Sequence, residues 1–300
     1  MIKKTLVIIG ARGIGDLIYH LPLLRSLHKT YKNKIYILSN KVSKAKHVFK
    51  NESFYHDIRY FDNDRYGIIK TIRNIISFKN LINSYDVDQI ILTSNATRLI
   101  LPVILSNIKK KEIFGQGNLI INKDKSLNHL TISERLIIYT KNLKLKKTDK
   151  SFFLNSKKLN NTKSKKKIFM SIDSHHDQNN WDIKNYVDLA DKLSKKNIIY
   201  INFSPSKKYF LNYFNKKNLI FTYKYNISKI INIIDSCDVV IGNESGPVCL
   251  GSALKKRVHA IYIPIHTKPE SKVIYSKNIY YNTRKLSSKL IQKKILDNLY

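Results

Sequence analysis

The residues best suited to chemistry lie in two short loops, each of which follows an apolar strand and leads into an apolar helix. The first loop, residues 10–16, reads Gly-Ala-Arg-Gly-Ile-Gly-Asp and contains Arg12, Gly13, Gly15 and Asp16. The carboxyl end of a strand is where open α/β sheets bind their ligands, so the Asp16 carboxylate is a candidate general base. The competing interpretation is an acid that only caps the following helix.

The second loop, residues 242–247, reads Gly-Asn-Glu-Ser-Gly-Pro and follows the strand-like residues 238–241. Pro247 suits the first position of a helix, and Ser245 or Gly246 can cap it. Free N–H groups at such a helix start, backed by the helix dipole, favour a phosphate. The loop therefore predicts an anion site, and the competing interpretation is a purely structural turn.

The net charge is large, but the composition argues against dedicated nucleic-acid binding. The 300 residues carry a formal charge of +34, and only nine of the 55 basic residues are arginine. Arginine leads in forked contacts to phosphates and base edges, so a lysine excess spread over the whole chain is a poor nucleic-acid signature. The charge still favours peripheral contact with an anionic membrane, by about 1 kcal/mol per suitably placed basic residue.

The sequence predicts a cytoplasmic protein, which the charge would also draw to the inner face of the cytoplasmic membrane. No apolar run reaches the roughly 20 residues of a spanning helix, and the start of the chain leads into a strand instead of a signal-peptide core. Cys237 and Cys249 are too few for a disulfide framework, so we expect reduced thiols.

Short apolar runs alternate with amphipathic stretches, which predicts an α/β fold with parallel, doubly wound sheets. Strands are expected near residues 5–9, 34–38, 89–93, 168–172, 198–203, 219–222, 239–241 and 259–263. Helices are expected near residues 66–82, 98–108, 183–193, 207–214, 228–235, 247–254 and 287–299. Residues 155–167 have almost no apolar side chains and predict a linker between two halves.

Three segments in this order resemble the ADP-heptose:lipopolysaccharide heptosyltransferases, glycosyltransferase family 9. They are Arg-Gly-Ile-Gly-Asp at residues 12–16 with Leu-Pro-Leu-Leu-Arg-Ser-Leu at 21–27, Trp-Asp-Ile-Lys-Asn-Tyr-Val-Asp-Leu-Ala-Asp-Lys-Leu at 181–193, and Ile-Gly-Asn-Glu-Ser-Gly-Pro at 241–247 with Ala-Leu at 253–254. The resemblance covers nearly the whole chain and implies a GT-B fold, in which two Rossmann-like domains face a central cleft.

The resemblance also implies how the chain is divided. Residues 1–155 would form an N-terminal acceptor-binding Rossmann-like domain, and residues 165–285 a C-terminal nucleotide-sugar-binding one. The last helix, within residues 286–300, is expected to pack back on the N-terminal domain.

The activity implied is an inverting glycosyltransferase that needs neither a metal ion nor a cofactor. The donor would be a nucleotide diphosphate sugar similar to ADP-heptose, and the acceptor a lipopolysaccharide core, another glycan or a lipid-linked glycan. Asp16 resembles the family's catalytic aspartate, and Arg12, Gly13 and Gly15 would line the acceptor side. The donor-binding candidates are Asn243, Glu244, Ser245, Gly246, Pro247, His175, His176 and Lys184.

The chain departs from the family pattern around the expected diphosphate. Asn179 and Asn180 stand where the family has a basic residue, and Cys249 replaces a histidine. Glu244 replaces an aspartate, and residues 204–208 lack the carboxylate that the family often places near the ribose. A cation for the departing diphosphate is therefore missing from its expected places.

His175, His176 and Lys184 are the candidates to replace that cation, because the loop that holds the two histidines leaves a strand on the same side of the sheet. A solvated loop is the plain alternative. A metal site built from Asp173, His175, His176 and Asp177 is a third, but adjacent ligands rarely converge on one ion, and no metal is expected.

Two other functions compete with the transferase. Gly13, Ile14 and Gly15 match part of the dinucleotide-binding fingerprint of oxidoreductases, but Ile18 stands at the third glycine position and no acid follows the second strand. The second alternative is a catalytically impaired, transferase-like protein that only binds a nucleotide sugar or a glycan.

Overall fold

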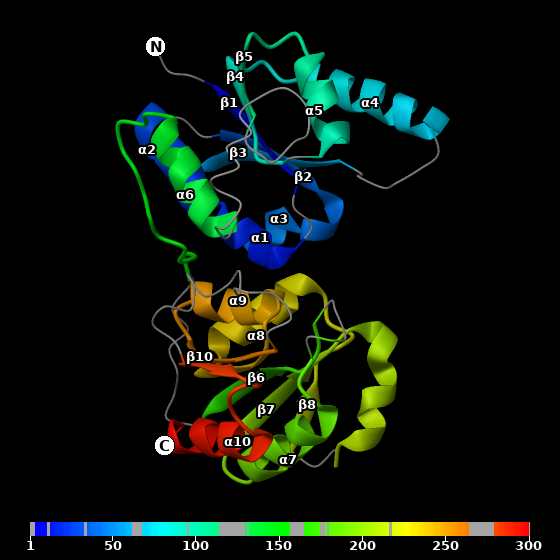
Figure 1. Ribbon diagram of the computed structural model, residues 1–300, viewed down its shortest axis with the longest axis vertical. Helices are drawn as coiled ribbons and strands as arrows, with labels where there is room; N and C mark the ends of the chain where they lie inside the picture. The colour runs from blue at the N-terminus through cyan, green and yellow to red at the C-terminus, as the bar shows by residue number, and fades with distance from the viewer. Residues whose placement is uncertain are drawn as a thin grey trace. The chain divides into compact units, whose positions relative to one another are not determined.

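The computed structural model divides the chain into two compact units, Met1–Phe152 and Phe153–Tyr300 (Figure 1). The structure describes residues 4–10, 13–32, 35–61, 68–94, 96–113, 130, 132–156, 165–174, 178, 180–215, 218–263 and 279–299. Each unit contains one parallel sheet, as the alternation of strands and helices predicts. Among the described residues, none of the helices combines the length and the apolar character that crossing a membrane requires.

The N-terminal unit is a five-stranded sheet in the order β3-β2-β1-β4-β5. Its strands are β1 (Thr5–Ile9), β2 (Ile35–Asn40), β3 (Tyr55–Phe61), β4 (Gln89–Leu92) and β5 (Lys110–Ile113). Its helices are α1 (Ile14–Tyr19), α2 (Leu21–Tyr31), the 3-10 helix η1 (Lys41–Ser43), α3 (Ala45–Val48), α4 (Ile68–Asn83), α5 (Thr97–Ile104) and α6 (Ile132–Asn142). Helices α4 and α5 lie on one side of the sheet and α2 and α6 on the other (Figure 1), so the apolar strand β1 is buried on both faces.

The C-terminal unit is a six-stranded sheet in the order β11-β10-β9-β6-β7-β8. Its strands are β6 (Lys167–Ser171), β7 (Ile198–Asn202), β8 (Leu219–Phe221), β9 (Val239–Asn243), β10 (Arg257–Tyr262) and β11 (Ile279–Asn282). Its helices are α7 (Ile183–Ser194), the 3-10 helix η4 (Pro205–Tyr213), α8 (Ile227–Ser236), α9 (Gly246–Ala253) and α10 (Ser288–Asp297). The order changes direction between β6 and β9, and ligands of open parallel sheets bind beyond the strand ends at such a point.

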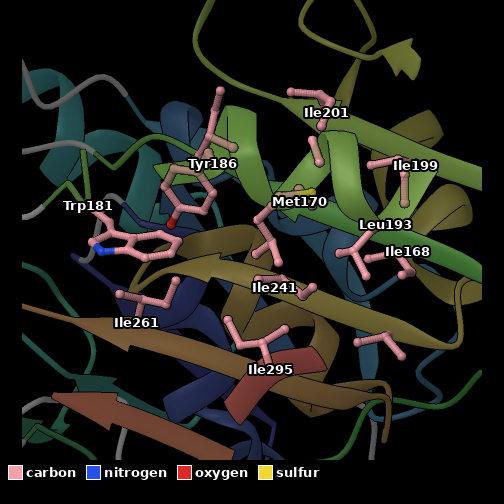
Figure 2. Close-up of a cluster of buried hydrophobic side chains, with 14 of the residues drawn as sticks. Ile168, Met170, Trp181, Tyr186, Leu193, Ile199, Ile201, Ile241, Ile261 and Ile295 are labelled. Atoms are coloured by element: carbon pink, nitrogen blue, oxygen red, sulfur yellow. The ribbon is translucent and has the colours of Figure 1, made fainter. Parts of the chain in front are cut away.

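The core of this unit includes the last helix of the chain. Figure 2 shows Trp181 and Tyr186 side by side at one end of the cluster, with ring centroids 5.0 Å apart, and Ile295 of α10 in the same cluster. Ile291 and Ile295 are fully buried, and the Trp181 indole Nε1 donates to Ser288 Oγ over 3.3 Å. The expectation that this helix packs back on the N-terminal domain is corrected, because its apolar face is buried within the C-terminal unit.

One further expectation changes. Residues 207–214 do not form an α-helix, because the 3-10 helix η4 starts at Pro205 and is interrupted at Lys207, whose φ of −102° and ψ of 30° are not helical. This segment buries none of its residues fully, so no packed face selects an α-helix over the tighter 3-10 form. Of the predicted linker, residues 155, 156, 165 and 166 belong to no helix or strand, and residues 157–164 lie outside the described residues.

Candidate active site

A polar pocket of about 480 Å³ lies in the C-terminal unit, at the carboxyl ends of β6, β7 and β9. These strands are parallel, so the loops that follow them meet at one edge of the sheet. The residues that line the pocket are Ser171, Asp173, Ser174, Asn202, Phe203, Ser204, Ser206, Lys207, Ser245, Gly246 and Pro247. Three of the predicted donor-binding residues, at 245–247, are therefore brought together in its wall.

The start of α9 presents backbone donors to this pocket. Ser245 is the N-cap residue, but its side chain makes no capping hydrogen bond, and its Oγ lies 3.2 Å from Ser171 Oγ. The first N–H groups of a helix lack partners within the helix, and here they belong to Gly246 and Val248 because Pro247 has none. This geometry suits an anion, as the sequence predicts.

The pocket also contains an ion pair that the sequence analysis missed. Lys207 Nζ lies 3.5 Å from Asp173 Oδ1, and the other carboxylate oxygen accepts the Ser204 N–H over 2.8 Å. The side chains of Lys207 and Asp173 are only 15% and 8% exposed. The one signal in the sequence was a lysine shortly after the end of a predicted strand, which is too common in this chain to single it out.

Asn243 is a structural residue in this arrangement. Its side chain is fully buried, and its Oδ1 accepts the Trp181 N–H over 2.8 Å and the Tyr186 hydroxyl over 2.9 Å. Its Nδ2 donates to the Ile172 carbonyl over 3.0 Å and to Asn180 Oδ1 over 3.1 Å. The amide has no capacity left for a ligand, which corrects its predicted role in donor binding.

Two further donor candidates, Lys184 and Glu244, do not line the pocket. Lys184 is exposed on the first turn of α7, where its N–H donates to Asp182 Oδ1 over 2.9 Å. Glu244 is half-buried, and burial, followed by the charge of Glu244, raises the pKa of Tyr262. His175 and His176 lie outside the described residues, as does Asp177 of the alternative metal site.

In the N-terminal unit, Asp16 lies in the first turn of α1 and caps its own loop. Its Oδ2 accepts the Gly13 N–H over 2.9 Å, which is the capping interpretation realised in the structure. Burial raises the pKa of the Asp16 carboxyl, and the hydrogen bond from Gly13 partly opposes that rise. Gly15 lies within α1, and Arg12 is outside the described residues.

A buried histidine that the sequence analysis missed anchors the same helix. His20 Nδ1 lies 2.6 Å from the Asp16 carbonyl oxygen, and Nε2 lies 2.7 Å from Thr93 Oγ1. Since a carbonyl only accepts, Nδ1 carries the proton and Nε2 accepts from the Thr93 hydroxyl. Burial lowers the pKa of His20 to about 4, so the ring is neutral near pH 7 and positions the backbone without adding charge.

Comparison with known sequences identifies one family. A family model described as glycosyltransferase family 9 (heptosyltransferase) matches residues 119–297. No curated protein sequence matches the chain at a significant level.

Comparison with solved structures identifies the same fold at low sequence identity. The glycosyl transferase family 9 structure from Veillonella parvula has a TM-score of 0.74 and 16% identity, over 94% of this chain and 86% of that one. ADP-heptose lps heptosyltransferase II of E. coli has a TM-score of 0.73 and 14% identity, over 98% of each chain. Heptosyltransferase WaaC of E. coli, solved with ADP-2-deoxy-2-fluoro heptose, has a TM-score of 0.72 and 11% identity, over 98% of this chain and 99% of that one. These likenesses confirm the predicted α/β fold with two Rossmann-like domains.

Proposed function

Because this chain belongs to glycosyltransferase family 9, the heptosyltransferases, we propose that it moves a heptose-like sugar from a nucleotide diphosphate donor to a lipopolysaccharide core or another glycan. The single observation that carries the donor half of the proposal is the polar pocket at the start of α9. The E. coli heptosyltransferase WaaC, which shares the fold, was solved with ADP and with ADP-2-deoxy-2-fluoro heptose. We therefore take an ADP-heptose-like molecule as the first donor to test.

The donor's diphosphate would lie against the N–H groups of Gly246 and Val248. The hydroxyls of Ser171 and Ser245 are 3.2 Å apart beside that helix start and can donate to phosphate oxygens. Backbone donors and a helix dipole stabilise the negative charge that develops on a departing diphosphate. They do so without a divalent ion, and this is the basis for proposing metal-independent transfer.

Asp16 is the proposed general base. Its carboxylate would accept the proton of the acceptor hydroxyl while that oxygen forms a bond to the anomeric carbon. The bond from this carbon to the diphosphate oxygen breaks at the same time, on the opposite face of the sugar, so the configuration inverts. A pKa above the ordinary value, which burial gives Asp16, makes a carboxylate a stronger base.

A second candidate is a protein that binds a nucleotide sugar or glycan without turnover. It is favoured by the Asp16 hydrogen bond to Gly13, which already gives that carboxylate a structural role, and by two uncharged residues, Asn180 and Cys249, at positions where the family has cations. Both candidates bind the nucleotide, so only turnover separates them.

We also propose that the protein works in the cytoplasm and contacts the inner face of the cytoplasmic membrane peripherally. The support is the formal charge of +34, which attracts a protein to anionic lipid. Binding to vesicles that contain anionic lipid, lost at high salt and absent with neutral vesicles, is the expected result.

The first experiment is a thermal-unfolding screen against nucleoside diphosphates and their sugars. A true ligand at 100 times its dissociation constant stabilises the folded state by about 2.7 kcal/mol. Donor turnover is then measured as release of the free nucleotide, before and after exhaustive chelation. We expect unchanged turnover, whereas activity that chelation abolishes and magnesium or manganese restores would contradict metal independence. A chain that no nucleotide diphosphate stabilises would overturn the proposed function.

A further inference from the structure

We propose that Lys207 supplies the positive charge that binds the donor's diphosphate, and that Asp173 holds this lysine in place. The inference rests on the proposed function, because it concerns the same pocket. It places the positive charge in the segment that follows β7, whereas the family pattern places cations in the loop before α7 and in α9.

The two positions where the family has cations, residues 180 and 249, carry none in this chain, and the structure uses both side chains internally. Asn180 Oδ1 accepts the Ser174 N–H over 2.8 Å and a hydrogen of the Asn243 amide over 3.1 Å, so this residue closes the loop after β6. Cys249 is only 4% exposed on α9 and does not line the pocket. Neither side chain carries a positive charge that could contact a diphosphate.

Lys207 is the cationic side chain among the described residues that line the pocket. It lies where η4 departs from helical geometry, and its ammonium is 5.8 Å from the centroid of the Phe210 ring. Phe210 in turn packs against Phe203, with centroids 5.7 Å apart. The ammonium is therefore held beside an aromatic wall, which limits the side-chain entropy that ligand binding would cost.

The contact with Asp173 restrains the ammonium without locking it. At 3.5 Å it is longer than the roughly 2.7–2.9 Å of a strong charge-assisted hydrogen bond. The carboxylate itself is fixed, because its Oδ2 accepts the Ser204 N–H. An ammonium has three N–H donors, so Lys207 can keep this contact while it donates to a phosphate oxygen.

Whether the pocket attracts or repels an anion depends on Lys207. Asp173 is the carboxylate among the described lining residues, and without Lys207 it would repel a phosphate from a site that is only 8% exposed at Asp173. With the pair intact, the opposite charges cancel, and the serine hydroxyls and the α9 dipole leave the pocket favourable to an anion.

The test compares Lys207→Met with Lys208→Met, which removes the same charge from an exposed neighbour that does not line the pocket. Affinity for ADP and for inorganic pyrophosphate is measured by calorimetry. Hydrogen bonds to charged groups contribute about 1.5–3 kcal/mol, so Lys207→Met should weaken both probes roughly 10- to 100-fold. Lys208→Met should stay within about twofold of the wild type.

Two further variants protect the test against a folding defect. Lys207→Arg keeps the charge and should restore most of the affinity that Lys207→Met loses. Asp173→Asn keeps an acceptor for the Ser204 N–H but removes the charge that holds the Lys207 ammonium, so it should lose part of the pyrophosphate affinity that Lys207→Met loses. Binding as tight as that of the wild type would overturn the role given to Asp173.

Each remaining outcome is decisive. Equal pyrophosphate binding by Lys207→Met and the wild type overturns the assignment while leaving the proposed function standing. Loss of ADP binding alone, with pyrophosphate unaffected, also overturns it, because the lysine would then contact the nucleoside. A wild-type protein that binds neither probe overturns the proposed function and this inference together.

Discussion

The turn from β1 to α1 and the turn from β9 to α9 share one sequence pattern but differ in electrostatics. In the first, the Asp16 carboxylate folds back on the Gly13 N–H, so an acid fills the helix start. In the second, Ser245 leaves the start of α9 uncapped, beside a pocket lined by hydroxyls and Lys207. The proposed anion site is therefore the turn whose helix start is uncapped and lies beside a polar pocket.

The two turns are also held in place by different means. A neutral histidine, His20, joins the backbone of α1 to Thr93 at the end of β4. At the second turn, the buried amide of Asn243 joins the loop after β6 to the end of β9 through four hydrogen bonds. In the first turn the hydrogen bonds come from His20, and the Asp16 carboxylate stays half-buried. In the second turn they use the whole side-chain amide of Asn243, which the sequence alone assigns to ligand binding.

The largest effect is expected from Asp16→Asn, which tests whether the first turn is catalytic as well as structural. The amide can still accept the Gly13 N–H but cannot accept a proton, and losing a positioned base costs about 10²- to 10⁴-fold in rate, roughly 3–5 kcal/mol of barrier. Turnover should fall at least about 100-fold. Because burial raises the pKa of Asp16, its ionised form costs folding free energy near pH 7, so the melting temperature should not fall. Full activity would assign Asp16 to capping alone.

The second effect is the loss of stability in Asn243→Ala. Truncation leaves the Trp181 N–H, the Tyr186 hydroxyl and the Ile172 carbonyl buried without this partner, at about 1–3 kcal/mol each before relaxation. We expect about 3–5 kcal/mol less unfolding free energy for the C-terminal unit in urea. The matched change at the first turn, Asp16→Ala, removes one cap and should cost only about 1 kcal/mol. Similar costs for the two changes would contradict the difference drawn between these supports.

The third prediction concerns acid, and it involves one buried histidine in each unit. Burial lowers the pKa of His20 and of His259 to about 4, from the ordinary value of 6.5. Their contribution to stability is therefore complete above about pH 6.5 and is lost as the pH falls towards 4, by about 3 kcal/mol for each residue. His259 Nε2 is buried without a hydrogen-bond partner among the described residues, and Nδ1 lies 3.3 Å from the Tyr281 hydroxyl. His259→Leu should therefore reduce this pH dependence and cost only about 1 kcal/mol near pH 7, for the one hydrogen bond that is lost. Unfolding free energies at pH 7 and pH 4.5 measure it, and an unchanged pH dependence in His259→Leu would exclude His259 as a source.

The smallest predicted effect separates the glycines that end the two central strands. A Cβ on Gly242 would lie 2.2 Å from the Ser171 carbonyl oxygen, which belongs to the backbone of β6. A Cβ on Gly10 would meet Ser94 Cβ and Oγ at 2.5 Å and Leu99 Cδ1 at 2.7 Å, and these contacts can be relieved by rotation of the hydroxyl and the leucine and by a small shift of the loop after β4. Gly242→Ala should therefore cost about 1–3 kcal/mol, and Gly10→Ala less. Equal melting temperatures for the two variants would contradict the predicted difference between a backbone and a side-chain contact.

Much of the fold could be predicted because its central strands are continuous apolar runs. β3 was missed, since His56, Asp57 and Arg59 interrupt its apolar pattern, and the sheet explains why: β3 is an edge strand with a solvated face. The apolar face of α10 was recognised, but the unit it packs against was not. Periodicity shows that a face is buried, and it does not show which element covers that face.

The candidate site was predictable where the backbone supplies the chemistry. The turn at residues 245–247 lines the pocket as its sequence suggests. The roles of Asn243 and Lys207 were less predictable, because each depends on the groups that surround the side chain in the folded protein. The first is surrounded by backbone and hydroxyl partners, and the second is held over a pocket by Asp173.

The most direct test of the account is a calorimetric titration of ADP into Gly246→Val and Asp16→Asn. The proposed diphosphate site is the start of α9, and the proposed base lies at the start of α1. A β-branched side chain at Gly246 should block the approach of a phosphate to the backbone and weaken binding at least about tenfold, whereas Asp16→Asn should bind as the wild type does. Wild-type affinity in a folded Gly246→Val protein, or loss of binding in Asp16→Asn, would contradict this division between the two turns.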